Sequence, residues 1–177
     1  RYLDNILKGG YTTMSFLRKV GVKHFVVTLA AMAFLLSTVS YGAPMGNAKS
    51  VDVDGIKTSY FEGGNGEAMV LVHGGSFGST VSANCWSPIF DDLAAHFHVY
   101  VIDKLGQGYT DNPLDDADYT MAAVTRHIHR FMETVGIQKV HLVGHSRGAL
   151  PAARLATDHP EMIESLILFN SGTLARD

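Results

Sequence analysis

One short segment of the sequence combines a hydroxyl side chain with glycines in a pattern that could support nucleophilic chemistry. Gly144-His145-Ser146-Arg147-Gly148 reads G-x-S-x-G. A serine held on a sharp turn presents its hydroxyl to a substrate, and the flanking glycines leave room for the turn to close. Ser146 is therefore the candidate nucleophile for attack on an ester or another activated carbonyl carbon.

The surroundings of this pentapeptide have the order that such a turn requires. An apolar run, Val140–Val143, precedes it, and a helical pattern from Arg147 to about Asp158 follows. A buried strand, a sharp turn and a helix form the setting in which the motif is functional. Pro151 falls within the first turns of this helix, where we expect it to remove a backbone hydrogen bond and kink the helix.

A glycine-rich segment upstream could stabilise the negative charge that such an attack creates. The segment His73–Ser76 directly follows the apolar run Met69–Val72. Acyl transfer creates an oxyanion beside the nucleophile, and removing one preorganised N–H donor to it costs roughly 3 to 4 kcal/mol. One donor is expected from the backbone amide of Arg147, directly after the serine. The other is expected from Gly75, with Ser76 as the second choice.

The elements that would hold these groups begin with a hairpin and continue as buried strands. Asp54-Gly55 is a strong turn dipeptide between two short alternating runs, which predicts an antiparallel hairpin. Strands that are apolar on both faces belong in a parallel sheet covered by helices. Such runs occur at Met69–Val72, Val99–Ile102, Val140–Val143 and Ile163–Phe169.

Helical patterns separate these runs. Apolar residues recur at spacings of three and four after Thr120, a plausible N-cap, and Gly136 stands where that helix should end. A second helix is predicted over Pro88–His96, and a third follows the serine. Strands that alternate with helices predict an α/β fold with a doubly wound, mostly parallel sheet.

A third motif supports a family resemblance. Asp103–Pro113 begins D-x-x-G-x-G-x-T-D, so the chain carries H-G-G, this motif and G-x-S-x-G in that order. With this combination the chain resembles the α/β-hydrolase superfamily over about Val51–Ser171. The resemblance implies the α/β-hydrolase fold and a cofactor-independent hydrolase with a small-molecule substrate and Ser146 as its nucleophile.

The resemblance extends to particular branches and residue roles. The glycine-rich loop and the aspartate motif are similar to those of carbon–carbon bond hydrolases that act on meta-cleavage products, and of related esterases. The dehalogenase and epoxide hydrolase branches carry aspartate as the nucleophile, so Ser146 argues against them. The resemblance also implies that His73 shapes its loop and that Asp103 orients its neighbours, rather than either one reacting.

A serine hydrolase also needs a base and an acid, which in this family follow the serine in the order acid, then histidine. After Ser146 the sequence has one histidine, His159, and four carboxylates: Asp158, Glu161, Glu164 and Asp177. None stands where the resemblance implies, beyond a seventh and an eighth strand. We therefore expect residues 43–177 to be the N-terminal part of a hydrolase domain, ending after about the sixth strand and inactive by itself.

The N-terminal region has the character of an export signal. Basic residues from Arg18 to Lys23 precede the apolar run Phe25–Val39, which ends at small residues before Ala43. This order predicts a signal peptide over Met14–Gly42 and a secreted or periplasmic protein. The run is shorter than the ~20 residues that span a bilayer. A cleaved signal, with no stable membrane association afterwards, is thus favoured over an anchor or a buried helix.

Residues 1–13 precede the first methionine, Met14. Lys8-Gly9-Gly10 can be encoded by a sequence that resembles a bacterial ribosome-binding site. We therefore interpret residues 1–13 as translated upstream sequence, with a natural extension as the alternative. The codons for these three residues decide between the two.

Charge and composition exclude several other classes of protein. Residues 43–177 hold nine Lys or Arg against 16 Asp or Glu, so no basic field favours nucleic acid as a partner. Cys85 is the single cysteine, which excludes an internal disulfide. No histidine combines metal-ligand spacing with a convergent carboxylate. Two hypotheses remain: a serine hydrolase that uses Ser146, or a non-catalytic binding protein that has kept the scaffold.

Overall fold

The computed structural model describes residues 45–171. The predicted signal peptide at 14–42 and the interpretation of residues 1–13 lie outside the described residues. Within 45–171, no helix is both long and apolar enough to cross a membrane.

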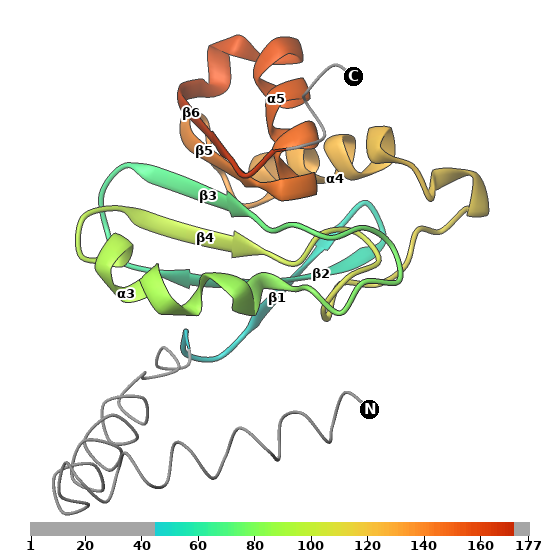
Figure 1. Ribbon diagram of the computed structural model, residues 1–177, viewed down its shortest axis with the longest axis horizontal. Coiled ribbons are helices and arrows are strands. Elements are labelled where there is room, and N and C mark those ends of the chain that lie inside the picture. Colours follow the sequence, from blue (N-terminus) through green and yellow to red (C-terminus); the bar gives the residue numbers. More distant parts are fainter. Residues whose placement is uncertain (1–44, 172–177) are drawn as a thin grey trace, which may run out of the picture. The chain divides into compact units, whose positions relative to one another are not determined.

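A six-stranded sheet forms the centre of the described structure (Figure 1). Its strands, in the spatial order β1-β2-β4-β3-β5-β6, are β1 (Lys49–Val53), β2 (Ile56–Gly63), β4 (His98–Ile102), β3 (Ala68–Val72), β5 (Val140–His145) and β6 (Ile163–Phe169). β3 pairs in parallel with both β4 and β5, and β5 with β6, whereas β1–β2 and β2–β4 are antiparallel. The predicted mostly parallel sheet is therefore confirmed.

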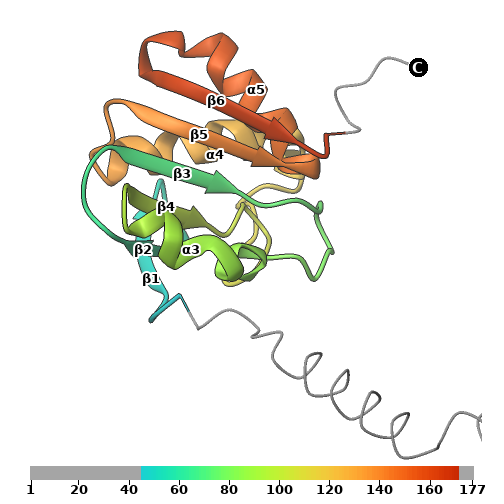
Figure 2. The same ribbon diagram turned by 60° about the vertical axis from the view of Figure 1, so that its left-hand side comes forward.

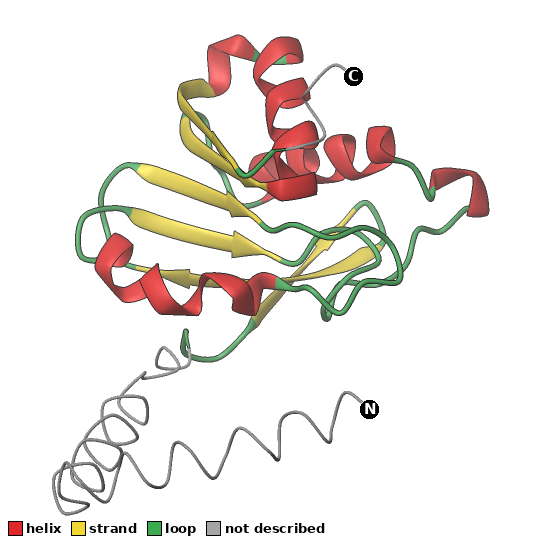
Figure 3. Ribbon diagram, in the orientation of Figure 1, coloured by secondary structure: helices red, strands yellow, loops and turns green. Residues whose placement is uncertain are grey.

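Helices cover both faces of this sheet (Figure 2, Figure 3). α3 (Ser87–Ala94) lies on one face, while α4 (Met121–Thr134) and α5 (Ala149–Asp158) lie on the other. Short 3-10 turns complete the described elements: Ala83–Trp86, Asp116–Asp118, Ser146–Gly148 and Pro160–Met162. This arrangement confirms the doubly wound α/β architecture.

The central strand β3 shows why the sheet needs both layers. Val70 and Val72 pack into the cluster under α4 and α5, and Met69 and Leu71 pack into the cluster under α3. Successive side chains of a strand point to opposite faces, so a strand that is apolar at every position requires cover on both. β3 is thereby fixed in the middle of the domain, and its carboxyl end is a rigid base for the loop that follows.

The ends of α4 follow the sequence signals closely. The Thr120 side chain accepts a hydrogen bond of 3.1 Å from the amide of Ala123, as an N-cap does. Gly136 follows the C-cap with a φ of +79°, a conformation that glycine adopts without the strain of a Cβ.

The kink predicted at Pro151 is wrong. α5 begins at Ala149, so Pro151 occupies the third position of the helix. The first backbone N–H groups of a helix have no partner within it, and a proline there removes no helical hydrogen bond. α5 therefore runs as one helix to Asp158.

Candidate functional site

The backbone of Ser146 has the strained conformation expected of a nucleophile on a sharp turn. The residue stands directly after β5, at the start of the Ser146–Gly148 turn, with a φ of +52°. Residues with a Cβ rarely adopt this left-handed conformation, and it persists only where the surrounding structure enforces it. The strand-turn-helix setting predicted for Ser146 is thus present.

The two glycines of the motif are required by close packing. A Cβ on Gly144 would lie 2.6 Å from the Cα of Ala149, and one on Gly148 would lie 2.4 Å from the carbonyl oxygen of His73. Both positions meet backbone atoms, which cannot rotate away as a side chain could. Glycine at each position therefore lets the turn fold tightly against α5 and the end of β3.

The glycine-rich loop after β3 lies beside the serine. A Cβ on Gly74 would be 3.0 Å from the Cβ of Ser146. The next residue, Gly75, has a φ of +72°, and a Cβ there would lie 2.5 Å from the hydroxyl of Ser79. The structure therefore brings together the two segments that were predicted to supply the nucleophile and the oxyanion donors.

His73 holds the start of this loop and is neutral. Its Nε2 accepts a hydrogen bond of 3.1 Å from the backbone N–H of Lys104, so the ring proton is on Nδ1, which donates to the carbonyl of Gly74 at 2.8 Å. Complete burial, the dominant cause, lowers the pKa of His73 to about 3. These contacts agree with the structural role implied for His73, because a ring with both nitrogens engaged cannot serve as the base.

Lys104 is a candidate site residue that sequence analysis missed. It is the largest fully buried side chain of the described residues, 1% exposed, and its Nζ donates to the carbonyl of Gly75 at 2.8 Å. Burial and then the charge of Arg147 lower the pKa of Lys104 to about 8. A signal was present: a lysine two residues after the apolar run Val99–Ile102 stands at the carboxyl end of a central strand, where ligands of α/β sheets bind.

Asp103 and Gln107 fix the neighbouring loop. The Asp103 carboxylate accepts hydrogen bonds from the amides of Ala83, at 2.7 Å, and Tyr109, at 3.0 Å. Gln107 donates to the carbonyl of Ser76 at 2.8 Å. The carboxylate of Asp103 is thus engaged with backbone amides, which agrees with the orienting role implied for it.

The remaining predicted residues have distinct positions. Arg147 is exposed and follows Ser146 in the turn. His159 lies beyond the other end of α5, where its ring stacks on His129 at 3.7 Å between centroids and its Nδ1 is 3.6 Å from Glu161. It is therefore poorly placed to act as the base. Within residues 45–171, no group of three or more potential ligand side chains could hold a metal ion.

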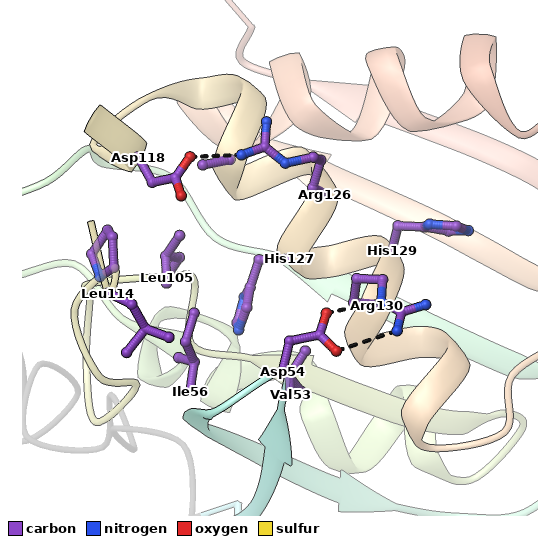
Figure 4. A pocket seen from close by; sticks show the side chains of 12 residues that line it. Val53, Asp54, Ile56, Leu105, Leu114, Asp118, Arg126, His127, His129 and Arg130 are labelled. Atoms are coloured by element: carbon purple, nitrogen blue, oxygen red, sulfur yellow. Dashed lines mark hydrogen bonds and ion pairs between the residues drawn. The ribbon is translucent and has the colours of Figure 1, made fainter. Parts of the chain in front are cut away.

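An apolar cavity of about 410 Å³ lies elsewhere, between the β1–β2 turn and α4 (Figure 4). Two ion pairs border it: Asp54 with Arg130, at 2.9 Å, and Asp118 with Arg126, at 2.6 Å. Its lining contains neither Ser146 nor the His73–Ser76 loop. The cavity is thus separate from the candidate site.

Comparison with known proteins gives a consistent result. Residues 67–176 match the family model described as the alpha/beta hydrolase fold. The chain is 34% identical over 125 residues to 2-hydroxy-6-oxo-6-(2'-aminophenyl)hexa-2,4-dienoic acid hydrolase of Metapseudomonas resinovorans, covering 70% of this chain and 42% of that protein. It is also 34% identical over 117 residues to 2-hydroxymuconate semialdehyde hydrolase of a Pseudomonas species, covering 66% of this chain and 41% of that protein.

Solved structures agree with these relatives. A serine hydrolase involved in carbazole degradation is 33% identical and superposes with a TM-score of 0.64, covering 71% of this chain and 48% of its own. The 2-hydroxy-6-oxo-6-phenylhexa-2,4-dienoate hydrolase of a Rhodococcus species is 26% identical, with a TM-score of 0.67 and coverage of 74% and 48%. The chain thus spans less than half the length of each of these proteins.

Proposed function

Because this chain belongs to the α/β-hydrolase family, we propose that it forms part of a hydrolase in which Ser146 attacks a carbonyl carbon of a small-molecule substrate. The observation that carries the proposal is the backbone of Ser146, held at a φ of +52° between β5 and α5. Strain of this kind concentrates at functional sites, where it serves to present a reacting group. The two relatives compared above are named hydrolases, which supports the same reaction class.

The chemistry that we propose is acyl transfer to the serine. The hydroxyl oxygen of Ser146 bonds to the carbonyl carbon, its proton passes to a general base, and the carbonyl oxygen becomes an oxyanion. The bond from that carbon to the leaving group then breaks as the carbonyl re-forms, and the leaving group takes the proton from the base. The backbone amides of Arg147 and Gly75 donate to that oxygen. In this proposal the general base lies outside residues 45–171, and so does the acid that orients it. We accordingly expect the 177-residue chain alone to hydrolyse no more ester than its Ser146→Ala variant does.

An acidic substrate fits the charges at the site. Arg147 is exposed beside Ser146, and Lys104 donates to a backbone carbonyl rather than to a carboxylate. Burial, and to a smaller extent the nearby positive charge of Arg147, lowers the pKa of Lys104. A carboxylate on the substrate would reduce this repulsion. One matched relative is named for a dienoic acid, so we propose an ester or a cleavable carbon–carbon bond in a carboxylate-bearing molecule.

Export is also part of the proposal. The order of basic, apolar and small residues over Met14–Gly42 supports cleavage at or near Ala43 and a secreted or periplasmic enzyme. Mass spectrometry of the exported protein should find an N-terminus at or near Ala43. A mature protein that retains Phe25–Val39 would contradict cleavage.

The central test is covalent labelling of the full-length protein by a fluorophosphonate probe. The probe should attach to Ser146, and Ser146→Ala should abolish the labelling. Ser79→Ala is the matched control, because Ser79 lies in the neighbouring loop and its hydroxyl accepts a hydrogen bond from the amide of Val81 at 3.1 Å. A protein that folds but is not labelled would instead be the non-catalytic binding protein.

The charge of the substrate is tested with a matched pair of esters. Mono-p-nitrophenyl succinate and p-nitrophenyl butyrate have similar length, but only the first carries a carboxylate. Arg147→Gln should raise KM for the succinate and leave KM for the butyrate within about twofold, because only the charged ester loses an ion pair. Equal effects on the two esters would exclude recognition of a carboxylate by Arg147.

A further inference from the structure

Three successive carbonyls of the glycine-rich loop each accept a hydrogen bond from a side chain. His73 donates to the carbonyl of Gly74, Lys104 to that of Gly75, and Gln107 to that of Ser76, each at 2.8 Å. The described residues contain no cis peptide bond. In a planar trans peptide the C=O of one residue and the N–H of the next point in opposite directions. Fixing these carbonyls therefore fixes the next N–H groups on the opposite side.

This geometry connects each clamp to one amide. The His73 contact sets the direction of the Gly75 N–H, and the Lys104 contact sets that of the Ser76 N–H. These two amides are the candidates for the oxyanion donor that this loop supplies. The loop backbone also lies against the serine, since a Cβ on Gly74 would be 3.0 Å from the Cβ of Ser146.

The contact made by Lys104 differs from the other two because the donor is a buried ammonium group. Charged groups seldom occur fully buried, and a buried charge with only one backbone acceptor is costly. A cation bonded to a carbonyl also polarises that peptide, which makes the N–H of the same unit a stronger donor. The Lys104 contact thus sets the direction of the Ser76 N–H and makes that N–H a stronger hydrogen-bond donor.

We propose that Lys104 is a positioning residue that orients and polarises the Ser76 amide as an oxyanion donor, from its contact with the Gly75 carbonyl. The inference rests on the proposed function, because it assigns a role in stabilising the oxyanion that attack by Ser146 creates. It also makes Ser76 an additional donor beside Arg147 and Gly75. At neutral pH the ammonium is mostly charged, since the pKa of Lys104 is about 8.

The test compares Lys104→Met with wild type in the full-length protein, using p-nitrophenyl butyrate and a fluorophosphonate probe. Methionine fills similar volume but cannot donate to the Gly75 carbonyl. Removing an oxyanion donor costs roughly 100- to 1,000-fold in kcat, so weakening one should lower kcat about tenfold or more. KM should stay within about twofold, because the oxyanion exists only in the transition state. The rate of probe labelling at Ser146 should fall in parallel with kcat.

The controls separate this role from a purely structural one. Lys139→Met removes a lysine that is exposed and paired with Glu164, and should leave kcat unchanged. Lys104→Arg keeps a charged donor and should retain more of the wild-type kcat than Lys104→Met does. Thermal unfolding establishes that each variant is folded. Should Lys104→Met not fold, Lys104→Gln replaces it with the same expectation, because the shorter amide cannot reach the carbonyl.

Two results would overturn the inference: a folded Lys104→Met or Lys104→Gln protein with the kcat of wild type, or a loss confined to KM. Failure of the proposed function gives a different result, since wild type itself would then show neither labelling nor turnover that depends on Ser146.

Discussion

The carbonyl oxygen of His73 lies 2.4 Å from the position that a Cβ on Gly148 would occupy. The carbonyl oxygen of Val72 is nearly as close to that position, at 2.6 Å. Both atoms belong to the end of β3 and to the loop that begins there. This contact sets how closely the turn after Ser146 approaches the glycine-rich loop, and the separation of nucleophile and oxyanion donors depends on it.

Gly148→Ala should therefore destabilise the fold and impair the site together. The added Cβ meets two backbone carbonyls at the end of β3, and overpacking of this kind costs about 1–3 kcal/mol. Urea unfolding measures the loss. Gly78→Ala is the control, since a Cβ there has nothing within 4 Å and only the φ of +77° opposes it. Equal losses in the two variants would mean that the contact with β3 has no effect.

The strain at Ser146 can be measured by comparing two variants that both lack the hydroxyl. Ser146→Gly should be more stable than Ser146→Ala by about 1 kcal/mol, because glycine adopts a φ of +52° without a Cβ clash. Both should be inactive. Denaturant titrations of the two proteins provide the measurement. An alanine variant as stable as the glycine variant would show that the backbone of Ser146 is unstrained.

Local signals in the sequence were sufficient for the fold. Asp54 and Gly55 have φ values of +53° and +84°, the conformation that a two-residue hairpin turn requires. Thr120 caps α4 as its residue type and position suggested. The continuous apolar runs became parallel strands because each needs cover on both faces. In each case the structure is determined by residues close together in the sequence or by a regular pattern of apolar residues.

The contacts that sequence analysis missed connect residues far apart in the chain. The position of Lys104 after an apolar run places it at the end of a strand but does not show that its ammonium contacts the carbonyl of Gly75, because that contact exists only once β3 and β4 lie side by side. The role of Pro151 was misjudged for a local reason. A 3-10 turn over Ser146–Gly148 delays the start of α5, and the motif alone does not reveal that delay.

Acid should destabilise the fold through buried histidines. The Thr58 hydroxyl donates to the carbonyl of Ile56 and so accepts from Nε2 of His127, at 2.9 Å. Burial lowers the pKa of His127 from 6.5 to about 4. Between these values the unfolded chain binds a proton that the folded chain does not. The stability present above pH 6.5 is thus lost as the pH falls toward 4.

His127 accounts for a loss of about 2 kcal/mol in the free energy of unfolding between pH 7 and pH 5. His127→Gln can still donate to Thr58 but does not titrate, so its unfolding free energy should fall less over that range. His73, with a pKa lowered to about 3, contributes with the same sign and remains in the variant. His96→Gln, at an exposed position, controls for the substitution. If the unfolding free energy of His127→Gln depends on pH as strongly as that of wild type, His127 is not a source of the acid sensitivity.

The last prediction concerns the edge of the sheet at β6. Within the described residues β6 pairs with β5 on one side only. Its apolar side chains are partly exposed: Leu166 at 37%, Ile167 at 49% and Phe169 at 38%. A long hydrophobic edge with unpaired backbone groups favours association with other chains, and contiguous apolar surface of this kind binds hydrophobic dyes.

Residues 43–177, expressed alone, should therefore bind 1-anilinonaphthalene-8-sulfonate and self-associate, and Ile167→Lys should reduce both effects. A lysine on an edge strand opposes pairing by charge and removes apolar surface from the centre of the exposed group. Ile89→Lys is the matched control, because Ile89 is similarly exposed, at 43%, but lies on α3 rather than on a strand edge. Dye fluorescence and light scattering measure the two effects. If the two lysine variants behave alike, general surface hydrophobicity rather than the β6 edge causes the association, because only Ile167 lies beside unpaired backbone groups.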